Sequence, residues 1–455
     1  MNEESTLAYA GLKVIDASQG LAGPYCATLL AQHGAEVIKI EPPQGDWARA
    51  LGTRYGDHSA LALSANRGKQ SIVLDLKNPA SAEIMQRLIA SADVFLESFR
   101  PGVASKLGLG YEALSKNNPG LVYLSISGFG QSGPYAERPG TDSVLQAYTG
   151  LMALNRDSTG APNRVGFLVV DTLTGLYSFQ AVATALARRA KTKRGEHLDV
   201  SLAQSASAFI SQKVIEAALE GENPRVINSP AGSYRASDAW IIIGLSKESH
   251  WQGLCQVMGR TDLLNEPRYA TFTQRADCLA ELQSIVAKEI AKRTADEWLQ
   301  ALEAADVLCN RVNNIRDWFE DPHALARGWV DYAPIDATVN IPAAVIPGVT
   351  PPTAGTQRAA WPSLGEHTSQ VLANNGFSDT DIAALLRSGA AVQAPSKQHA
   401  FEVEIIRPRN QSASSHNKTR IKRFGDHHVA TFLFIADLRQ RAVHTHNVCT
   451  KRLAE

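Results

Sequence analysis

A single carboxylate follows a short apolar segment, and its surroundings suit catalysis better than any other part of the chain. Phe167 to Val170 are apolar, Asp171 comes next, and an alanine-rich amphipathic segment runs from Leu176 to Arg189. This pattern predicts a strand followed by a helix, with Asp171 at the junction. There the carboxylate either caps the helix by accepting a hydrogen bond from a free amide, or acts as a nucleophile at the positive helix end. The local pattern favours the cap, because Asp caps are common.

The elements that would position Asp171 form an alternating series. Strands are expected at residues 12–15, 37–41, 71–76, 93–97, 121–126 and 197–200, with helical segments between them. The first of these helices is expected from Gly23 to Gly34. A strand, a helix and a second strand in this order make a parallel crossover unit. The series predicts an α/β fold with an open, parallel sheet and helices on both faces.

Changes in composition divide the chain into four expected segments. Residues 1–222 contain the alternating strands and helices, and a polar stretch rich in Pro, Gly and Ser then begins a smaller α+β unit at 223–335, with a helix expected over 248–258. Residues 335–362 are proline-rich and expected to be irregular, and residues 336–393 form a linker and a C-terminal part that returns to the first unit. The last 55 residues hold 10 Lys and Arg against 5 Asp and Glu. The same 55 residues include five of the twelve His, and residues 394–455 are therefore predicted to be a basic, disordered tail.

Charge and cysteine content argue against several functions. The chain has 45 Lys and Arg and 45 Asp and Glu, so no overall field favours nucleic acid or an anionic membrane. No apolar segment reaches the ~18 residues of a membrane span. The five Cys lack metal-binding spacing and indicate free thiols in a reducing compartment, and the acidic N-terminus lacks a signal pattern. We therefore expect a cytoplasmic protein with no metal site, no nucleic-acid partner and no membrane association.

Short motifs recur along the chain in an order and spacing that match one enzyme family. They lie at residues 23–24, 34–41, 66–77, 99–102, 109–112, 128–134, 138–142, 171–175 and 364–368. Each motif alone is weak evidence. The ordered set, which covers about residues 9–392, resembles the class III coenzyme A transferases of the CaiB/BaiF type. This family includes formyl-CoA transferase and α-methylacyl-CoA racemase.

The resemblance implies a fold. Family members are interlocked homodimers in which each chain forms a ring threaded by the other, with a large Rossmann-like domain that binds CoA and a smaller domain. Residues 364–390, whose local pattern indicates a helical hairpin, should then belong with the N-terminal half of the chain.

The resemblance also implies a mechanism. Asp171 matches the family's nucleophile, which attacks an acyl-CoA thioester to give a mixed anhydride and then an aspartyl-CoA thioester. Small residues near Asp171 and around Gly140 would allow close backbone approach at such a site. CoA and acyl-CoA are substrates in this scheme, and no tightly bound cofactor is expected. With the family pattern included, the nucleophile is favoured over the cap.

The same resemblance assigns contacts with CoA. The family positions that lie along CoA are matched here by Leu74, Lys77, Ser98, Phe99 and Arg100. A basic residue that approaches the CoA phosphates is matched by Lys106, and Arg49 is a further candidate. A solvated helix face explains Lys106 equally well, and a surface ion pair with Asp46 is the alternative for Arg49.

Departures from the family pattern narrow the substrate. Ser98 replaces an Asn of many members, Thr141 replaces an aromatic residue, and Leu21 replaces a Gln of formyl-CoA transferase. Formyl-CoA and oxalate are therefore not expected as substrates. The overall pattern resembles transferases that use succinyl-CoA and dicarboxylic acids. Arg138 or Arg164 would then hold the distal carboxylate, unless these arginines are structural.

Three other functions stay open on the sequence. The racemase reaction uses a His within a Gly-His-Asp motif, which here reads Gly140-Thr141-Asp142. Because a proton base must reach the α-carbon, the absence of that imidazole argues against racemisation. A non-catalytic CoA-binding protein and an acyl-CoA-dependent lyase are the remaining alternatives.

Overall fold

The computed structural model describes residues 6–157, 159–221, 224, 226–335 and 339–394. Apart from Ala394, the expected tail lies outside the described residues. Within the described part of the chain, no helix is long and apolar enough to cross a membrane.

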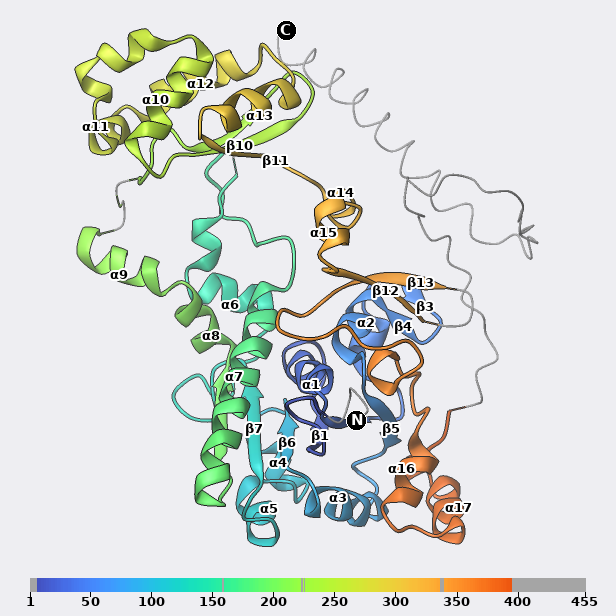
Figure 1. The fold of residues 1–455 in the computed structure, drawn as a ribbon. Helices are drawn as coiled ribbons and strands as arrows, with labels where there is room; N and C mark the ends of the chain where they lie inside the picture. Colours follow the sequence, from blue (N-terminus) through green and yellow to red (C-terminus); the bar gives the residue numbers. More distant parts are fainter. Residues whose placement is uncertain (1–5, 158, 222–223, 225, 336–338, 395–455) are drawn as a thin grey trace, which may run out of the picture. The chain divides into compact units, whose positions relative to one another are not determined.

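One seven-stranded sheet organises the chain, in the order β14-β5-β2-β1-β6-β7-β8 (Figure 1). Six of its strands are parallel to one another, and only the short β14 is antiparallel, to β5. Their bounds are β1 Lys13–Ala17, β2 Glu36–Glu41, β5 Gln70–Leu74, β6 Val94–Glu97, β7 Val122–Ser127, β8 His197–Ser201 and β14 Ala391–Val392. The chain builds outward from β1 to β5 and then from β6 to β8 on the other side. The strand order therefore reverses between β1 and β6, and ligands of such sheets bind at this switch point.

Helices cover both faces of the sheet, as expected. Val14 and Ile15 are neighbours in β1 and belong to two different apolar cores, because successive side chains of a strand point to opposite faces. The first core joins the sheet to α1, α7 and α8, and the second joins it to α3, α16 and α17. The helices of this part are α1 Ala22–Gln32, α2 Ala60–Asn66, α3 Ala80–Ala90, α4 Val103–Lys106, α5 Tyr111–Asn117, α6 Asp142–Tyr148, α7 Val169–Thr192, α8 Leu202–Phe209 and α9 Ser211–Glu220.

The last described segment returns to the sheet formed by the first part of the chain. Helices α16 (Thr368–Asn374) and α17 (Asp379–Arg387) form the helical hairpin expected at 364–390. Strand β14 then pairs with β5, with Ala391 opposite Leu74. Val73 N also donates to Thr368 Oγ1 at 3.1 Å. The second core therefore contains residues from both ends of the described chain.

A third core lies in the middle of the sequence. Three antiparallel strands, β9 (Gly232–Arg235), β10 (Trp240–Gly244) and β11 (Leu308–Arg311), pack with α10 (Glu248–Met258), α11 (Phe272–Asp277), α12 (Leu279–Ile290) and α13 (Ala295–Ala304). Fully buried Trp298 is part of this core. Strand β9 begins inside the polar stretch that its composition marks as a boundary, and this strand contributes the buried Tyr234 to the core.

The segment after β11 is more regular than its proline content suggests. Helices α14 (Ile315–Phe319) and α15 (Pro322–Ala326) are followed by a hairpin of β12 (Val330–Pro334) and β13 (Asn340–Ala344). The prediction that residues 335–362 are irregular was therefore wrong for β13, whose Pro342 lies in a two-stranded ribbon where a missing amide is tolerated. A small pair of strands, β3 (Arg54–Tyr55) and β4 (His58–Ser59), precedes α2. Short 3₁₀ helices span Trp47–Ala50, Leu151–Leu154, Thr261–Asn265, Pro267–Tyr269 and Gln357–Ala359.

Candidate functional site

Asp171 lies in the first turn of a long helix and follows no strand. Helix α7 begins at Val169, so the predicted strand over 167–170 is wrong, and Phe167 is 57% exposed. Asp171 is not the cap either, because the N-cap position is Leu168, whose side chain makes no capping hydrogen bond. Local β-propensity of the two valines was overridden by a contact that is distant in sequence.

That contact is made by Asp142, the first residue of α6. Its Oδ2 accepts hydrogen bonds from the backbone amides of Val170 (2.7 Å) and Asp171 (3.2 Å). Its Oδ1 accepts from Nε2 of Gln146 at 2.6 Å, and Oε1 of Gln146 accepts from Val165 N at 2.9 Å. Asp142 and Gln146 are buried. Two of the first amides of α7, which a helix cannot satisfy itself, are thus satisfied by a carboxylate from another helix.

Close packing of α7 against α1 determines where Asp171 lies along the axis of α7, relative to the start of α1. A Cβ atom at Gly175 would lie 2.9 Å from the carbonyl oxygen of Ala22, so only glycine allows this approach. Gly175 is therefore level with the first residue of α1, and Asp171, four residues earlier, lies about 6 Å further along the helix axis. Helix α1 follows β1, and α7 leads into the parallel strand β8. Both helices consequently begin at the carboxyl-terminal edge of the sheet, and Asp171 projects beyond that edge.

The loop after β7 approaches the start of α6 just as closely. A Cβ atom at Gly128 would lie 2.9 Å from Cα of Gly140, and a Cβ atom at Gly140 would lie 2.9 Å from Cα of Gly128. The two backbones cross with no room for side chains. The expectation that glycine near residue 140 permits close backbone approach is confirmed.

The electrostatic setting of Asp171 favours the neutral carboxyl group. Burial, together with the negative charge of Asp142, raises the pKa of Asp171 to about 7. The helix end does not offset this, because the amides of Val170 and Asp171 already donate to Asp142. A carboxyl group with a pKa near neutrality at a ligand-binding edge is typical of a reactive residue.

Three of the residues assigned to CoA lie together at the switch point, directly after β6. Ser98 Oγ accepts a hydrogen bond from Gln19 N at 2.9 Å and so joins the loops that follow β6 and β1. Phe99 N donates to Glu97 Oε2 at 2.7 Å, and Phe99 is partly buried while Arg100 is exposed. The main chain of this loop is thus anchored at the edge where nucleotides bind in such sheets, with Phe99 packed against the second core and Arg100 exposed.

The remaining assigned residues are more scattered. The side chain of Leu74 is fully buried in the core, so a contact at this position would have to use the main chain. Lys77 follows β5 and is exposed, and Lys106 is exposed in the last turn of α4. These contacts with CoA stay predictions.

Arg49 is buried in an ion pair, and its partner differs from the one expected. Its Nε and Nη2 donate to the two carboxylate oxygens of Glu41, at 2.7 and 2.8 Å. The predicted surface pair with Asp46 is wrong, because Asp46 pairs with Lys39 at 2.9 Å. A phosphate at Arg49 would compete with this buried, bidentate pair.

Sequence reasoning missed the buried charges that support the β1–α1 loop. Lys39 Nζ donates to Ser18 O and to Asp46, and Asp46 Oδ1 accepts from Gly20 N at 3.0 Å. Beside them, burial lowers the pKa of Lys69 to about 8. The available signal was a Lys between two Ile in a strand, because a charge is rarely buried there unless it is paired.

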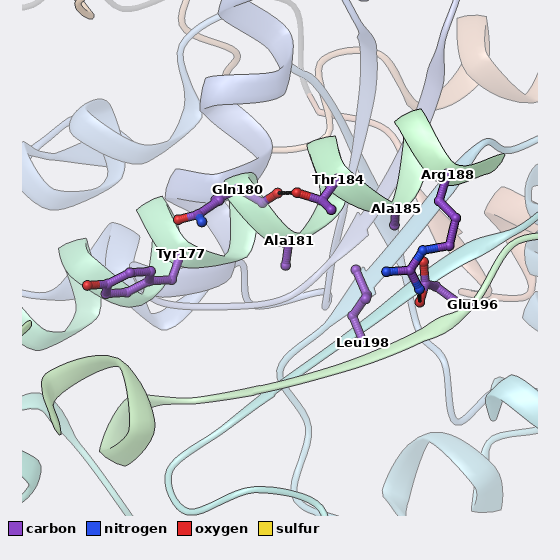
Figure 2. Close-up of a pocket in the computed structure, with 8 residues that line it drawn as sticks. All are labelled: Tyr177, Gln180, Ala181, Thr184, Ala185, Arg188, Glu196 and Leu198. Atoms are coloured by element: carbon purple, nitrogen blue, oxygen red, sulfur yellow. Dashed lines mark hydrogen bonds and ion pairs between the residues drawn. The ribbon is translucent and has the colours of Figure 1, made fainter. Parts of the chain in front are cut away.

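Two hollows lie elsewhere among the described residues. Figure 2 shows a groove along α7 and β8, where Thr184 Oγ1 donates to the Gln180 carbonyl and Arg188 pairs with Glu196 at 2.6 Å. A larger cavity of about 600 Å³ is lined by Tyr25, by other residues of α1 and α2, and by the β12–β13 hairpin. Asp171 lines neither hollow.

Comparison with known proteins gives a consistent result. The family model described as CoA-transferase family III matches residues 9–368. The succinate–glutarate CoA-transferase of Agrobacterium fabrum is 35% identical over 384 residues, which cover 80% of this chain and 94% of that protein. The succinyl-CoA–L-malate CoA-transferase beta subunit of Chloroflexus aurantiacus is 35% identical over 382 residues, covering 81% of this chain and 94% of that one.

A solved structure agrees with these sequence matches. The crystal structure of a CAIB/BAIF family protein from Brucella suis superposes with a TM-score of 0.73 at 32% identity. The match covers 81% of this chain and 99% of the Brucella chain.

Proposed function

Because the chain belongs to CoA-transferase family III, we propose that it transfers CoA from succinyl-CoA to a dicarboxylic acid, with Asp171 as the covalent nucleophile. CoA transfer itself follows from the family. The substrate class is supported by two relatives whose names specify succinate or succinyl-CoA with glutarate or malate.

One observation carries the role of Asp171. Its carboxyl group lies at the start of α7, held beyond the carboxyl-terminal edge of the sheet, in a setting that raises its pKa to about 7. A more basic carboxylate is a stronger nucleophile toward a thioester once it is ionised. Burial also limits access of water, which would hydrolyse activated intermediates.

The proposed reaction conserves the energy of the thioester. The Asp171 carboxylate attacks the acyl carbonyl of the donor and expels CoA thiolate, which leaves a mixed anhydride. The thiolate attacks the aspartyl carbonyl and releases the donor acid, which leaves an aspartyl-CoA thioester. The acceptor carboxylate attacks that thioester to form a second anhydride and again expels CoA thiolate. Attack of the thiolate on the acceptor's acyl carbonyl then releases the new acyl-CoA and regenerates Asp171.

The proposed CoA site comprises the loop at Ser98, Phe99 and Arg100, with Lys106, Lys77 and the main chain near Leu74 as further contacts. For the distal carboxylate of the acid, Arg138 and Arg164 stay candidates. Both are exposed, and the guanidinium of Arg138 stacks 3.6 Å from the ring centroid of Tyr135. Stacking of this kind restrains a guanidinium while leaving its N–H groups free to bind a carboxylate.

We further propose the interlocked homodimer, with a large domain of residues 1–222 and 336–393 and a small domain of residues 223–335. Pairing of β14 with β5 supports a large domain built from both ends. Helix α9 supports a partner chain, because its apolar side chains are uncovered: Val214 is 54%, Ile215 60% and Leu219 80% exposed. Free thiols at buried Cys26 and Cys255 support a reducing, cytoplasmic location.

The nucleophile is tested by trapping the acylated enzyme. With succinyl-CoA and no acceptor, hydroxylamine should convert Asp171 to a hydroxamate that mass spectrometry finds in the peptide containing this residue, since only an activated carbonyl reacts. Asp171→Asn should bind CoA and transfer none of it. Asp157→Asn makes the same chemical change at an exposed turn and should retain native activity. A hydroxamate at another residue, or near-native transfer by Asp171→Asn, would refute the assignment.

The substrate class is tested separately, with glutarate, malate, acetate and oxalate as acceptors for succinyl-CoA. Dicarboxylates with an aliphatic spacer should be the best acceptors, and failure of all of them would overturn the substrate proposal while leaving the nucleophile intact. Incubation of acyl-CoA in deuterated water without acceptor serves as a check on racemisation. Thr141 carries no imidazole, and we expect no exchange of the α-proton.

A further inference from the structure

A pair of buried polar side chains on α6 controls the start of α7. Asp142 and Gln146 are one helical turn apart, so they lie on the same face of α6. Together they accept or donate four hydrogen bonds: two from α7 amides to Asp142, one between the two side chains, and one from Val165 N to Gln146. Asp142 is 3% exposed and Gln146 is fully buried.

The pattern of donors leaves this pair with only one arrangement. All three backbone groups that face it are N–H donors, and the fourth donor is the Gln146 amide itself. Asp142 must therefore present an acceptor on both of its oxygens, and Gln146 must turn its Nε2 toward Asp142 and its Oε1 toward Val165. Because each position is determined by its neighbour, Gln146 orients Asp142, and Asp142 orients the backbone of Val170 and Asp171.

We propose that Asp142 and Gln146 act as a positioning pair, which holds the main chain of Asp171 in its reacting geometry and keeps one negative charge beside its carboxyl group. This inference rests on the proposed role of Asp171 as nucleophile. Neither side chain needs to touch substrate, and both act through Asp171.

The charge has a chemical consequence in addition to the geometric one. The elements packed against α7 carry few titratable or charged groups: Tyr25 and Cys26 on α1, Tyr123 on β7, His197 and Asp199 on β8, and Asp142 and Tyr148 on α6. Of these, Asp142 is the group whose charge acts on Asp171, and it adds to the effect of burial in raising the pKa of Asp171. Moving that charge away should lower the pH at which Asp171 becomes ionised.

A charge swap separates the two effects. In Asp142→Asn the NH2 group of the new side chain faces Nε2 of Gln146, so two donors meet. If the Gln146 side-chain amide flips, its Nε2 faces the donor Val165 N instead. One donor is unmatched in either arrangement. Combining Asp142→Asn with Gln146→Glu removes the mismatch, since the new amide at position 142 would donate to the new carboxylate at position 146. That carboxylate would also accept from Val165 N. The double variant keeps the native net charge and hydrogen-bond count, but its charge is one turn further from α7.

The test measures kcat/KM for CoA transfer between pH 5.5 and 9 in the native protein, both single variants and the double variant, with circular dichroism to verify folding. An unmatched buried donor costs about 1–3 kcal/mol. If this cost is present in the transition state, kcat/KM of Asp142→Asn should fall by about 5- to 150-fold. The double variant should recover to within about threefold of native at pH 9. Its activity should rise with pH at a lower midpoint than the native midpoint near 7.

Each outcome has a defined meaning. Native activity in Asp142→Asn would overturn the positioning role. A folded double variant that is no more active than Asp142→Asn would also overturn it. Full rescue with an unchanged pH midpoint would refute the charge effect. If Asp142→Asn does not fold, the double variant and Gln146→Glu still decide the matter, since the double variant should fold and exceed Gln146→Glu in activity. Failure of the proposed function is distinguishable, because it would appear as transfer by Asp171→Asn.

Discussion

Replacement of the proposed nucleophile should make the protein more stable as well as inactive. In Asp171→Asn the side chain keeps its size but cannot ionise. The native carboxyl has a pKa raised to about 7 by burial and by Asp142, against an ordinary value of 3.8. A folded-state pKa above the unfolded one means that ionisation opposes folding. The penalty is absent below pH ~4, grows as pH rises through this interval, and is complete above pH ~7.

The magnitude follows from the two pKa values. A difference of about three pH units corresponds to about 4 kcal/mol at 1.36 kcal/mol per unit. The side chain of Asp171 is only partly buried, so solvent screening reduces this energy. We expect Asp171→Asn to gain about 2–4 kcal/mol in free energy of unfolding at pH 8. At pH 5 the same relation gives about 1–2 kcal/mol, since most unfolded carboxyls but few folded ones are then ionised.

Urea unfolding at pH 4, 5, 6 and 8, at one protein concentration and followed by far-UV circular dichroism, measures the difference between native and variant. The gain in stability should increase with pH and level off above pH 7. Asp157→Asn is the control of opposite sign, because hydrogen bonds from Thr159 and Ala161 lower the pKa of Asp157. It should not gain stability at pH 8. A variant Asp171→Asn that is equally stable or less stable than native at pH 8 would refute the reasoning about burial and charge at this site.

Three further predictions address the scaffold and the CoA site. Gly175→Ala places a Cβ 2.9 Å from Ala22 O, so it should separate α7 from α1, lower the free energy of unfolding by about 1–3 kcal/mol and reduce kcat. The control is Gly166→Ala, because a Cβ at position 166 has open space. An unchanged kcat in Gly175→Ala would contradict the packing argument. Lys106→Gln should raise the KM for succinyl-CoA several-fold and weaken the dependence of this KM on salt, without changing kcat. Lys116→Gln, at an exposed position on α5, is the control and should change neither the KM nor its salt dependence. If Lys106→Gln has the same KM as the native protein, the CoA phosphates bind elsewhere. Truncation after Ala394 keeps the contacts of Gln393 with Ser369 and Gly365. The truncated protein should be a dimer by light scattering and should retain CoA-transferase activity. A monomeric or insoluble product would show that the removed residues are needed.

The sequence by itself determined the fold class and most elements of this protein. Alternating apolar strands and amphipathic helices predicted the parallel sheet, and the helix expected over 248–258 appears in the structure with those bounds. These features are local, because strand and helix periodicities depend on residues a few positions apart. Ordered motifs then placed Asp171 within a family, which no local periodicity could do.

Tertiary structure alone decided what surrounds Asp171. Local sequence placed it at the end of a strand, but two amides at the start of α7 bind a carboxylate 29 residues earlier in the chain, and this contact makes 169–171 helical. The partner of Arg49 was misassigned for the same reason. Asp46 is nearer to Arg49 in the sequence, but the fold brings Glu41 into the buried ion pair with Arg49. Hydrogen bonds and ion pairs between distant segments depend on the packing that brings them together. The sequence could therefore indicate Asp171 as the candidate nucleophile, whereas the pKa and orientation of this residue are set by the folded chain.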